Sequence, residues 1–93
     1  MYEYDEIDEA ISRANAINYA FQAAVLTRSI DTALYAFKQL QASAVMINDH
    51  TAFRVDWMPF AGLKESGCRT GGIPYTYRDM QIEKMAVFHT SAW

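Results

Sequence analysis

The sequence has few residues of the kinds that mark disulfide scaffolds, metal centres or membrane proteins. Only one of its 93 residues is cysteine, which excludes an intramolecular disulfide framework and a cysteine-based zinc site. No apolar run approaches the about 20 residues of a membrane-spanning helix. The formal net charge is −3, so the basic stripe of a nucleic-acid-binding protein is missing. We therefore expect a protein that binds neither nucleic acid nor membrane.

The N-terminal residues and the composition favour a folded cytoplasmic protein. The opening stretch, MYEYDEIDEA, is acidic, whereas a secretory signal peptide begins with a basic region. Apolar residues make up 52 % of the chain and charged residues 20 %, which is typical of globular proteins. We expect one small domain over residues 1–93, with a thin core.

Two segments carry the spacing of amphipathic helices. The first is expected near residues 5–14, where Asp5 can cap and carboxylates meet the positive end of the helix dipole. The second is expected over residues 30–41, with Ser29 as its N-cap. The apolar residues at helical spacing are Ile7, Ala10, Ile11 and Ala14 in the first segment, and Ile30, Ala33, Leu34, Phe37 and Leu40 in the second.

Short apolar runs at residues 23–27 and 44–47 predict buried strands on either side of the second helix. A strand–helix–strand unit makes its two strands parallel. Because parallel strands need cover on both faces, we expect the helix near residues 5–14 on one face and the helix over 30–41 on the other. The predicted fold class is therefore α/β, with a βαβ-containing unit over residues 1–48.

The second half of the chain is rich in residues that interrupt regular structure. Residues 49–79 are expected to form a long loop, because glycine, proline and polar residues break every periodic pattern there. Aromatic residues such as Trp57 argue against disorder in this loop. Apolar residues return over residues 80–90, which are expected to form a closing strand.

Cys68 is a candidate nucleophile with a simpler structural explanation. A neighbouring cation favours the reactive thiolate, and Arg69 follows directly. No histidine is close in sequence, so a cysteine in a turn is the favoured interpretation.

Metal and phosphate sites are weakly indicated. Asn48, Asp49 and His50 supply one imidazole and one carboxylate side by side, too few ligands for a metal, and His89 lies alone at the other end. A turn after a strand is favoured there. The glycines of residues 67–72 match neither the GxGxxG nor the GxxxxGK[ST] order, so they indicate a backbone turn.

Arg54 lies between Phe53 and Val55, with Asp56 next. An arginine among aromatic residues can bind an anionic substrate, because its planar guanidinium matches anions. It can equally pair with Asp56 or Asp49. Both interpretations are open at this point.

A longer pattern runs through residues 44–67. The stretch AVMINDHT is followed by FRVDWMPFAGLKESG. This order resembles the C-terminal region of the aldehyde dehydrogenase superfamily, where a strand ending in Asn precedes Pro-Phe-Gly-Gly-x-Lys-x-Ser-Gly. Residues 9–27 and 71–85 agree with that region in order and spacing, so the resemblance covers nearly the whole chain.

The resemblance implies part of an oxidoreductase that converts an aldehyde to an acid with NAD or NADP. In the family, the nucleophilic cysteine, the activating glutamate and the cofactor domain lie upstream of the matching segment. The resemblance therefore implies no catalytic, cofactor-binding or metal-binding residue in this chain. It implies that Phe53, Arg54 and Phe60 line the substrate tunnel, and that residues 81–89 form an oligomerisation strand.

The chain departs from the family at positions where glycine is usual. Because glycine serves positive φ angles and close backbone approach, each replacement predicts local strain or rearrangement. These departures, and the opening at Met1, favour a truncated paralogue or an excised fragment. The positions are Ala20, Ser43, Ala61 and Arg69.

Two functional interpretations are open. The chain is either a part of an aldehyde dehydrogenase that cannot catalyse alone, or a non-enzymatic assembly module that kept the fold. The expected partner is a second copy, in a homodimer or larger oligomer through residues 81–89, or the missing part of an aldehyde dehydrogenase.

Overall fold

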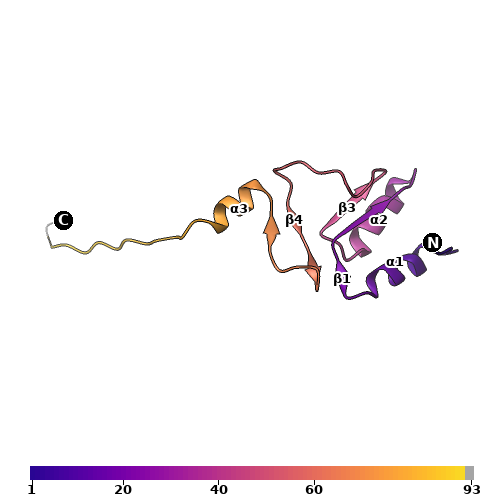
Figure 1. Cartoon of the computed structure of the whole chain (residues 1–93), viewed down its shortest axis with the longest axis horizontal. Coiled ribbons are helices and arrows are strands. Elements are labelled where there is room, and N and C mark those ends of the chain that lie inside the picture. The colour runs from indigo at the N-terminus through magenta and orange to yellow at the C-terminus, as the bar shows by residue number, and fades with distance from the viewer. Residues whose placement is uncertain (92–93) are drawn as a thin grey trace.

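The structure is a computed structural model of the chain and describes residues 1–91. Helices and strands gather at one end of the molecule, and the C-terminal residues extend away from them (Figure 1). This mixture of helices and strands confirms the predicted α/β class. The elements in order are α1 (Ile7–Asn15), β1 (Tyr19–Ala20), β2 (Gln22–Val25), α2 (Ile30–Gln39), β3 (Ala44–Ile47), β4 (Phe60–Ala61), β5 (Leu63–Lys64), β6 (Thr70–Gly71) and α3 (Ile73–Asp79).

The predicted βαβ unit is present. Strands β2 and β3 pair in parallel, from Gln22 opposite Ala44 to Val25 opposite Ile47, and α2 connects them. The Ser29 side chain caps α2, because its hydroxyl oxygen accepts a hydrogen bond from the Thr32 amide at 3.2 Å. The parallel pairing and the cap confirm the predictions made from residues 23–47.

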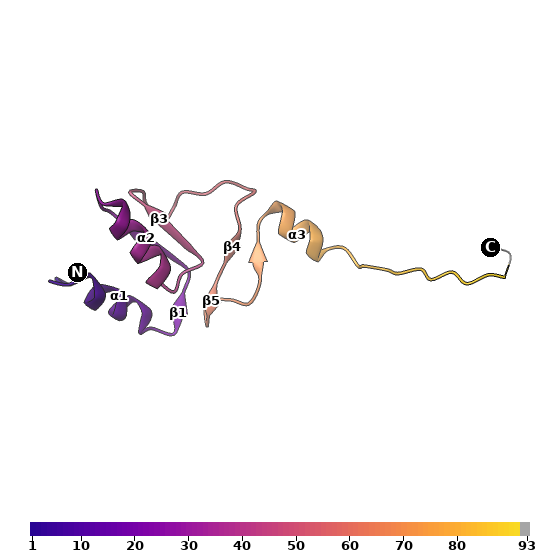
Figure 2. The same cartoon turned by 180° about the vertical axis from the view of Figure 1, so that it is seen from behind.

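Helices α1 and α2 lie side by side, so the expectation that they cover opposite faces of the strands was wrong (Figure 2). The Asn15 side chain joins their C-terminal ends. Its amide nitrogen donates to the Gln39 carbonyl and its amide oxygen accepts from the Gln41 amide, both at 2.8 Å. Ile11 and Ala36 are buried at the same hollow beside β2. Helix α1 begins at Ile7 without a side-chain cap, so the Asp5 cap was also wrong.

The buried core of this chain is very small. Among the described residues, the buried apolar side chains are Ile11, Ala20, Ala33 and Ala36. Helix α2 turns its small residues inward, and its larger residues Ile30, Leu34 and Phe37 are 70 %, 52 % and 60 % exposed. These three lie at i, i+4 and i+7, so they form an apolar stripe along the outer face of α2. This outer stripe has no cover within the described chain.

Residues 49–79 are more regular than the expected long loop. Strand β1 pairs antiparallel with β5, with Tyr19 opposite Lys64, and β4 pairs antiparallel with β6, with Phe60 opposite Gly71. Helix α3 follows β6. Proline was expected to interrupt regular structure in this region, but Pro74 lies in the first turn of α3, where its missing N–H costs no hydrogen bond because that position has no partner within the helix.

The four replaced glycines do not strain the backbone, which corrects the expectation from the family pattern. Among the described residues other than glycine, positive φ angles occur at Asn48 (57°) and Lys64 (52°). Lys64 stabilises its own bend, because its ammonium group donates to the carbonyls of Asn15 at 2.7 Å and Ile17 at 3.0 Å. The unstrained positions are Ala20, Ser43, Ala61 and Arg69.

The expected strand over residues 80–90 does not form within this chain. Residues 81–90 have no regular secondary structure and pair with none of the strands described above. They give the molecule a length of 75 Å and a radius of gyration of 20.0 Å, against about 13 Å for a compact chain of this size. A strand requires a neighbour for its backbone hydrogen bonds, and the other elements lie too far away.

A titration tests the contact between α1 and α2. The Tyr35 hydroxyl donates to the Asp8 carboxylate, and this hydrogen bond, with smaller effects of desolvation and of the Asp8 charge, raises the pKa of Tyr35 above 10.0. Because this pKa is raised, the stability that the contact contributes is fully present below pH 10.0. It is lost as the pH rises through the pKa of Tyr35 in the folded state. In an absorbance titration of tyrosinate, we expect Asp8→Ala to remove the component that titrates last. Asp5→Ala should leave the curve unchanged, and identical curves for wild type and Asp8→Ala would contradict the contact.

Candidate functional site

Asn48 ends β3 and fixes the start of the irregular loop over residues 48–59. Its side-chain oxygen accepts from the Thr27 amide at 2.8 Å, and its own amide donates to the Val25 carbonyl at 2.8 Å. Asparagine tolerates the φ of 57° that this bend requires. The loop therefore leaves the parallel strands in a defined direction.

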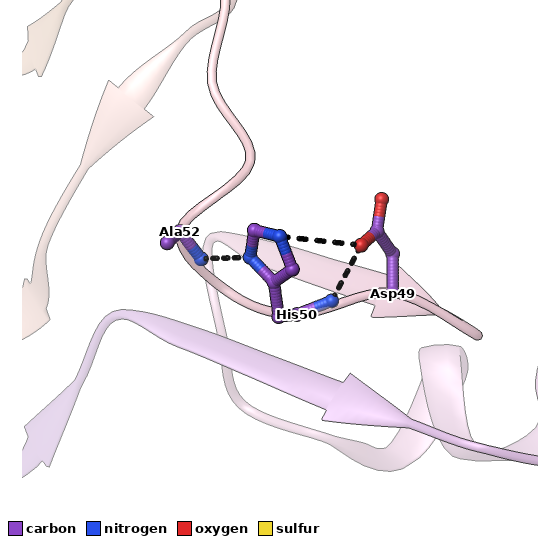
Figure 3. A network of polar contacts seen from close by, with 3 residues as sticks. All are labelled: Asp49, His50 and Ala52. Atoms are coloured by element: carbon purple, nitrogen blue, oxygen red, sulfur yellow. Dashed lines mark hydrogen bonds and ion pairs between the residues drawn. The ribbon is translucent and has the colours of Figure 1, made fainter.

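Asp49 and His50 form a closed turn at the start of this loop (Figure 3). The His50 ring accepts the Ala52 amide at Nδ1 (3.1 Å), and the His50 amide donates to the Asp49 carboxylate (2.7 Å). Since Nδ1 accepts, the proton of the neutral ring is on Nε2, which lies 3.7 Å from the same carboxylate. Within residues 1–91, no cluster of three or more His, Cys, Asp or Glu residues could hold a metal ion. The geometry is that of the turn favoured from the sequence.

The structure brings Arg54 and Phe60 together. The guanidinium carbon of Arg54 lies 4.0 Å from the centre of the Phe60 ring, a cation–π distance. The Phe60 ring also contacts Phe21 in an edge-to-face arrangement, with ring centres 4.6 Å apart and planes at 87°. Phe53 is 47 % exposed and takes part in no ring stacking within the described residues. Only two of the three expected substrate-lining residues therefore meet, and Phe21 joins them.

Ser43 links the segments that carry the two phenylalanines. Its hydroxyl donates to the Phe21 carbonyl at 2.7 Å and also contacts the Ala61 carbonyl. Residue 21 directly precedes β2 and residue 61 belongs to β4, so this side chain helps to hold Phe21 beside Phe60. Serine at a position where the family usually has glycine thus adds a polar contact.

Cys68 and the glycines of residues 67–72 were the candidates for a nucleophile and a phosphate turn. Cys68 is exposed, and the neighbouring Arg69 pairs with Asp79 at 3.6 Å. The glycines are packed against the chain itself. A Cβ atom at Gly72 would lie 2.6 Å from the Met58 carbonyl oxygen, so this backbone is not open to a phosphate.

No helix within residues 1–91 is long and apolar enough to cross a membrane.

The chain is similar to known proteins in both sequence and fold. The sequence profile described as "Aldehyde dehydrogenase family" matches residues 1–86. The 3-sulfolactaldehyde dehydrogenase of Priestia megaterium is 37 % identical over 87 residues, which are 94 % of this chain and 18 % of that protein.

Two crystal structures are similar in both fold and sequence. Aldehyde dehydrogenase 21 from Physcomitrella patens, in complex with the reaction product succinate, has a TM-score of 0.78 and 36 % identity, over 83 % of this chain and 16 % of that one. The glyceraldehyde-3-phosphate dehydrogenase GapN from Methanocaldococcus jannaschii, complexed with NADP, has a TM-score of 0.75 and 37 % identity, over 78 % of this chain and 16 % of that one. This chain spans about 18 % of the length of the curated relatives that it matches. The chain belongs to the aldehyde dehydrogenase family.

Proposed function

We propose that this chain acts as the C-terminal part of an NAD(P)-dependent aldehyde dehydrogenase and works only together with the polypeptide that supplies the nucleophile and the cofactor domain. In this role it contributes structure and substrate contacts, and the partner contributes the reacting groups. The chain alone does not turn over an aldehyde.

The small core is the observation that carries this proposal. Four buried residues, three of them alanine, cannot offset the conformational entropy of ordering 93 residues. The outer stripe of α2, Ile30, Leu34 and Phe37, lies on the same helix as the buried alanines. Apolar surface of this kind marks an interaction site. The chain matches 18 % of the length of such a relative. In our proposal, a polypeptide that corresponds to the remaining about 82 % covers the outer stripe of α2.

The loop after β3 is the part of this chain that meets the substrate in our proposal. It carries Arg54, which stacks on Phe60, and it starts from the turn that Asn48 and Asp49 hold. Loops that leave the carboxyl ends of parallel strands are the usual place for ligand contacts in α/β proteins. Cys68 takes no part in the chemistry.

A second proposal concerns residues 81–89. Ile82, Met85, Val87 and Phe88 are 78–94 % exposed in an extended segment. An exposed, extended apolar segment is a template for pairing with another chain. We propose that it pairs with the same segment of a second copy, because closed two-fold assemblies are the most common kind.

Reconstitution tests the main proposal. The full chain is mixed or co-expressed with the Priestia megaterium relative truncated before its matching segment, and oxidation of an aldehyde is followed with NAD and with NADP. We expect no turnover from either part alone and clear turnover from their complex, the reconstituted enzyme. Turnover by the isolated chain, or no complex at micromolar concentrations, would overturn the proposal.

The outer stripe of α2 provides the matched control. Leu34→Asn should weaken assembly by about tenfold or more, since a leucine that becomes buried contributes about 1.5–3 kcal/mol. Gln39→Asn changes the opposite side of the same helix and should leave assembly unchanged. Equal effects of the two substitutions would mean that the stripe does not face the partner.

A further inference from the structure

We infer that the turn over residues 49–52 is a pH-sensitive switch, in which protonation of His50 moves its ring from the Ala52 amide to the Asp49 carboxylate and releases the residues that follow. The switch is a property of this chain and does not depend on the proposed function. Its consequence for substrate contacts does rest on that function, because the loop over residues 48–59 is the part that we assign to the substrate.

The first step in the argument is that the His50 ring holds the turn closed (Figure 3). Its Nδ1 atom accepts a hydrogen bond from the Ala52 amide at 3.1 Å. The next amide, that of Phe53, donates to the His50 carbonyl at 3.4 Å, which is long for such a bond. The ring nitrogen is therefore the main acceptor that ties Ala52 to the start of the loop.

The second step is that this bond exists only while the ring is neutral. A neutral imidazole has one acceptor nitrogen, whereas both nitrogens of a charged imidazolium carry hydrogen and donate. In the charged ring, the Nδ1–H of His50 would point at the Ala52 N–H, and two donors repel each other. Histidine is the side chain that ordinarily changes its charge between about pH 5 and pH 8. Acidification within this range therefore removes the acceptor of the Ala52 amide.

The third step is that the charged ring has another partner within reach. The Nε2 atom of His50 lies 3.7 Å from the Asp49 carboxylate, which is too far for a hydrogen bond but close enough for an ion pair. The same carboxylate accepts from the His50 amide at 2.7 Å, so it is held beside the ring. The His50 side chain is 72 % exposed and has room to turn toward Asp49. The turn thus has two arrangements, each favoured by one charge state of the ring.

The other charged groups near this turn are engaged elsewhere or unpaired. In the described chain, the one ion pair of His50 is that with Asp49. Arg54, the one cation of the loop, stacks on an aromatic ring, and Asp56 lines a hollow beside α3. Arg28, at the connection that adjoins the base of the loop, forms no ion pair with any described residue. The charges of His50 and Asp49 therefore decide between the two arrangements.

Opening of the turn affects a short segment between two fixed points. Asn48 stays bonded to residues 25 and 27, because neither of these hydrogen bonds involves a titratable group. On the far side, the Asp56 carbonyl accepts from the Ile73 amide at 3.0 Å. Residues 52–55 lie between these points and lose their attachment when His50 is protonated. In the enzyme of our proposal, we therefore expect a lower pH to loosen the substrate contacts of this loop.

Nuclear magnetic resonance of the whole, isotopically labelled chain tests the switch. A hydrogen bond between two nitrogens transmits a scalar coupling, so the bond from the Ala52 amide to Nδ1 of His50 is observed directly. We expect this coupling at about pH 8 and its loss at about pH 5.5, with an upfield shift of the Ala52 amide proton. The Thr27 amide, which donates to the Asn48 side chain, should keep its position at both pH values.

His50→Asn is the matched variant, because an asparagine side chain accepts the amide two residues later and does not titrate. Its Ala52 amide should give the same signal at both pH values. His89→Asn removes the other of the two histidines and should leave the wild-type change intact.

The outcomes decide the inference whichever way they fall. A coupling between Ala52 and His50 at both pH values, or at neither, overturns the switch. A pH-dependent shift of the Ala52 amide that persists in His50→Asn also overturns it, because another group would then be the cause. None of these results concerns turnover by the reconstituted enzyme, so the proposed function is tested separately.

Discussion

Gly62→Ala is expected to separate β5 from β1 and to abolish turnover by the reconstituted enzyme. A Cβ atom at this position would lie 2.5 Å from the carbonyl carbon and oxygen of Ser66 and 2.8 Å from the Gly67 nitrogen. These are backbone atoms of the turn that follows β5, so they cannot rotate away as a side chain would. We expect a cost of about 3 kcal/mol or more, a large part of the stability of a small domain.

Amide hydrogen exchange in the free chain measures this effect without the partner. The Ala20 amide donates to the Ser66 hydroxyl at 3.1 Å, and the Glu65 amide donates to the Asn18 carbonyl at 3.0 Å. In Gly62→Ala both amides should exchange at least about tenfold faster. Gly67→Ala is the matched control, because its added Cβ would be 3.5 Å from the nearest atom, an ordinary contact. Unchanged exchange in Gly62→Ala would show that the turn is not packed as described.

Val87→Pro is expected to convert the proposed dimer into a monomer. Proline removes a backbone donor and is not accommodated within a paired strand. Residues 82–89 belong to no helix or strand of the described chain. The substitution should therefore change the assembly without unfolding β2 and β3.

Sedimentation at micromolar concentration measures the assembly, with Val87→Thr as the control. Threonine is also β-branched and keeps its N–H, so Val87→Thr should remain a dimer. The monomer has a mass of 10.6 kDa. A wild-type chain that sediments at this mass would contradict the pairing of residues 81–89. The circular dichroism of Val87→Pro, compared with wild type, checks that helices are retained.

The elements that were predicted correctly depend on contacts between residues close in sequence. The cap of α2 needs only Ser29 and the amide three residues later. The parallel pairing of β2 and β3 follows from the helix that connects them, since a crossover of this kind constrains the direction of the second strand. The short strands within residues 49–79 were missed because their partners are distant: Tyr19 pairs with Lys64, 45 positions further along the chain, in the register of β1 and β5.

The candidate site was partly predictable for the same reason. The aromatic neighbours of Arg54 indicated that it could bind a substrate, and the family pattern indicated both Arg54 and Phe60. Phe21 and Ser43 were missed, because their importance lies in contacts with Phe60 and Ala61, which are remote in sequence. The one signal for Phe21 in the sequence was that it is a large apolar residue close to a predicted buried strand.

The sequence by itself determined the family, the α/β class, the parallel strand pair and the capped helix between those strands. Each depends on residue order, on helical or strand spacing, or on a neighbour within one turn. Only the tertiary structure decided that α1 lies beside α2, that the replaced glycines are unstrained, and that Arg54 stacks on Phe60. The physical reason is that these outcomes depend on distances between segments far apart in the chain, where local preferences of the backbone carry no information.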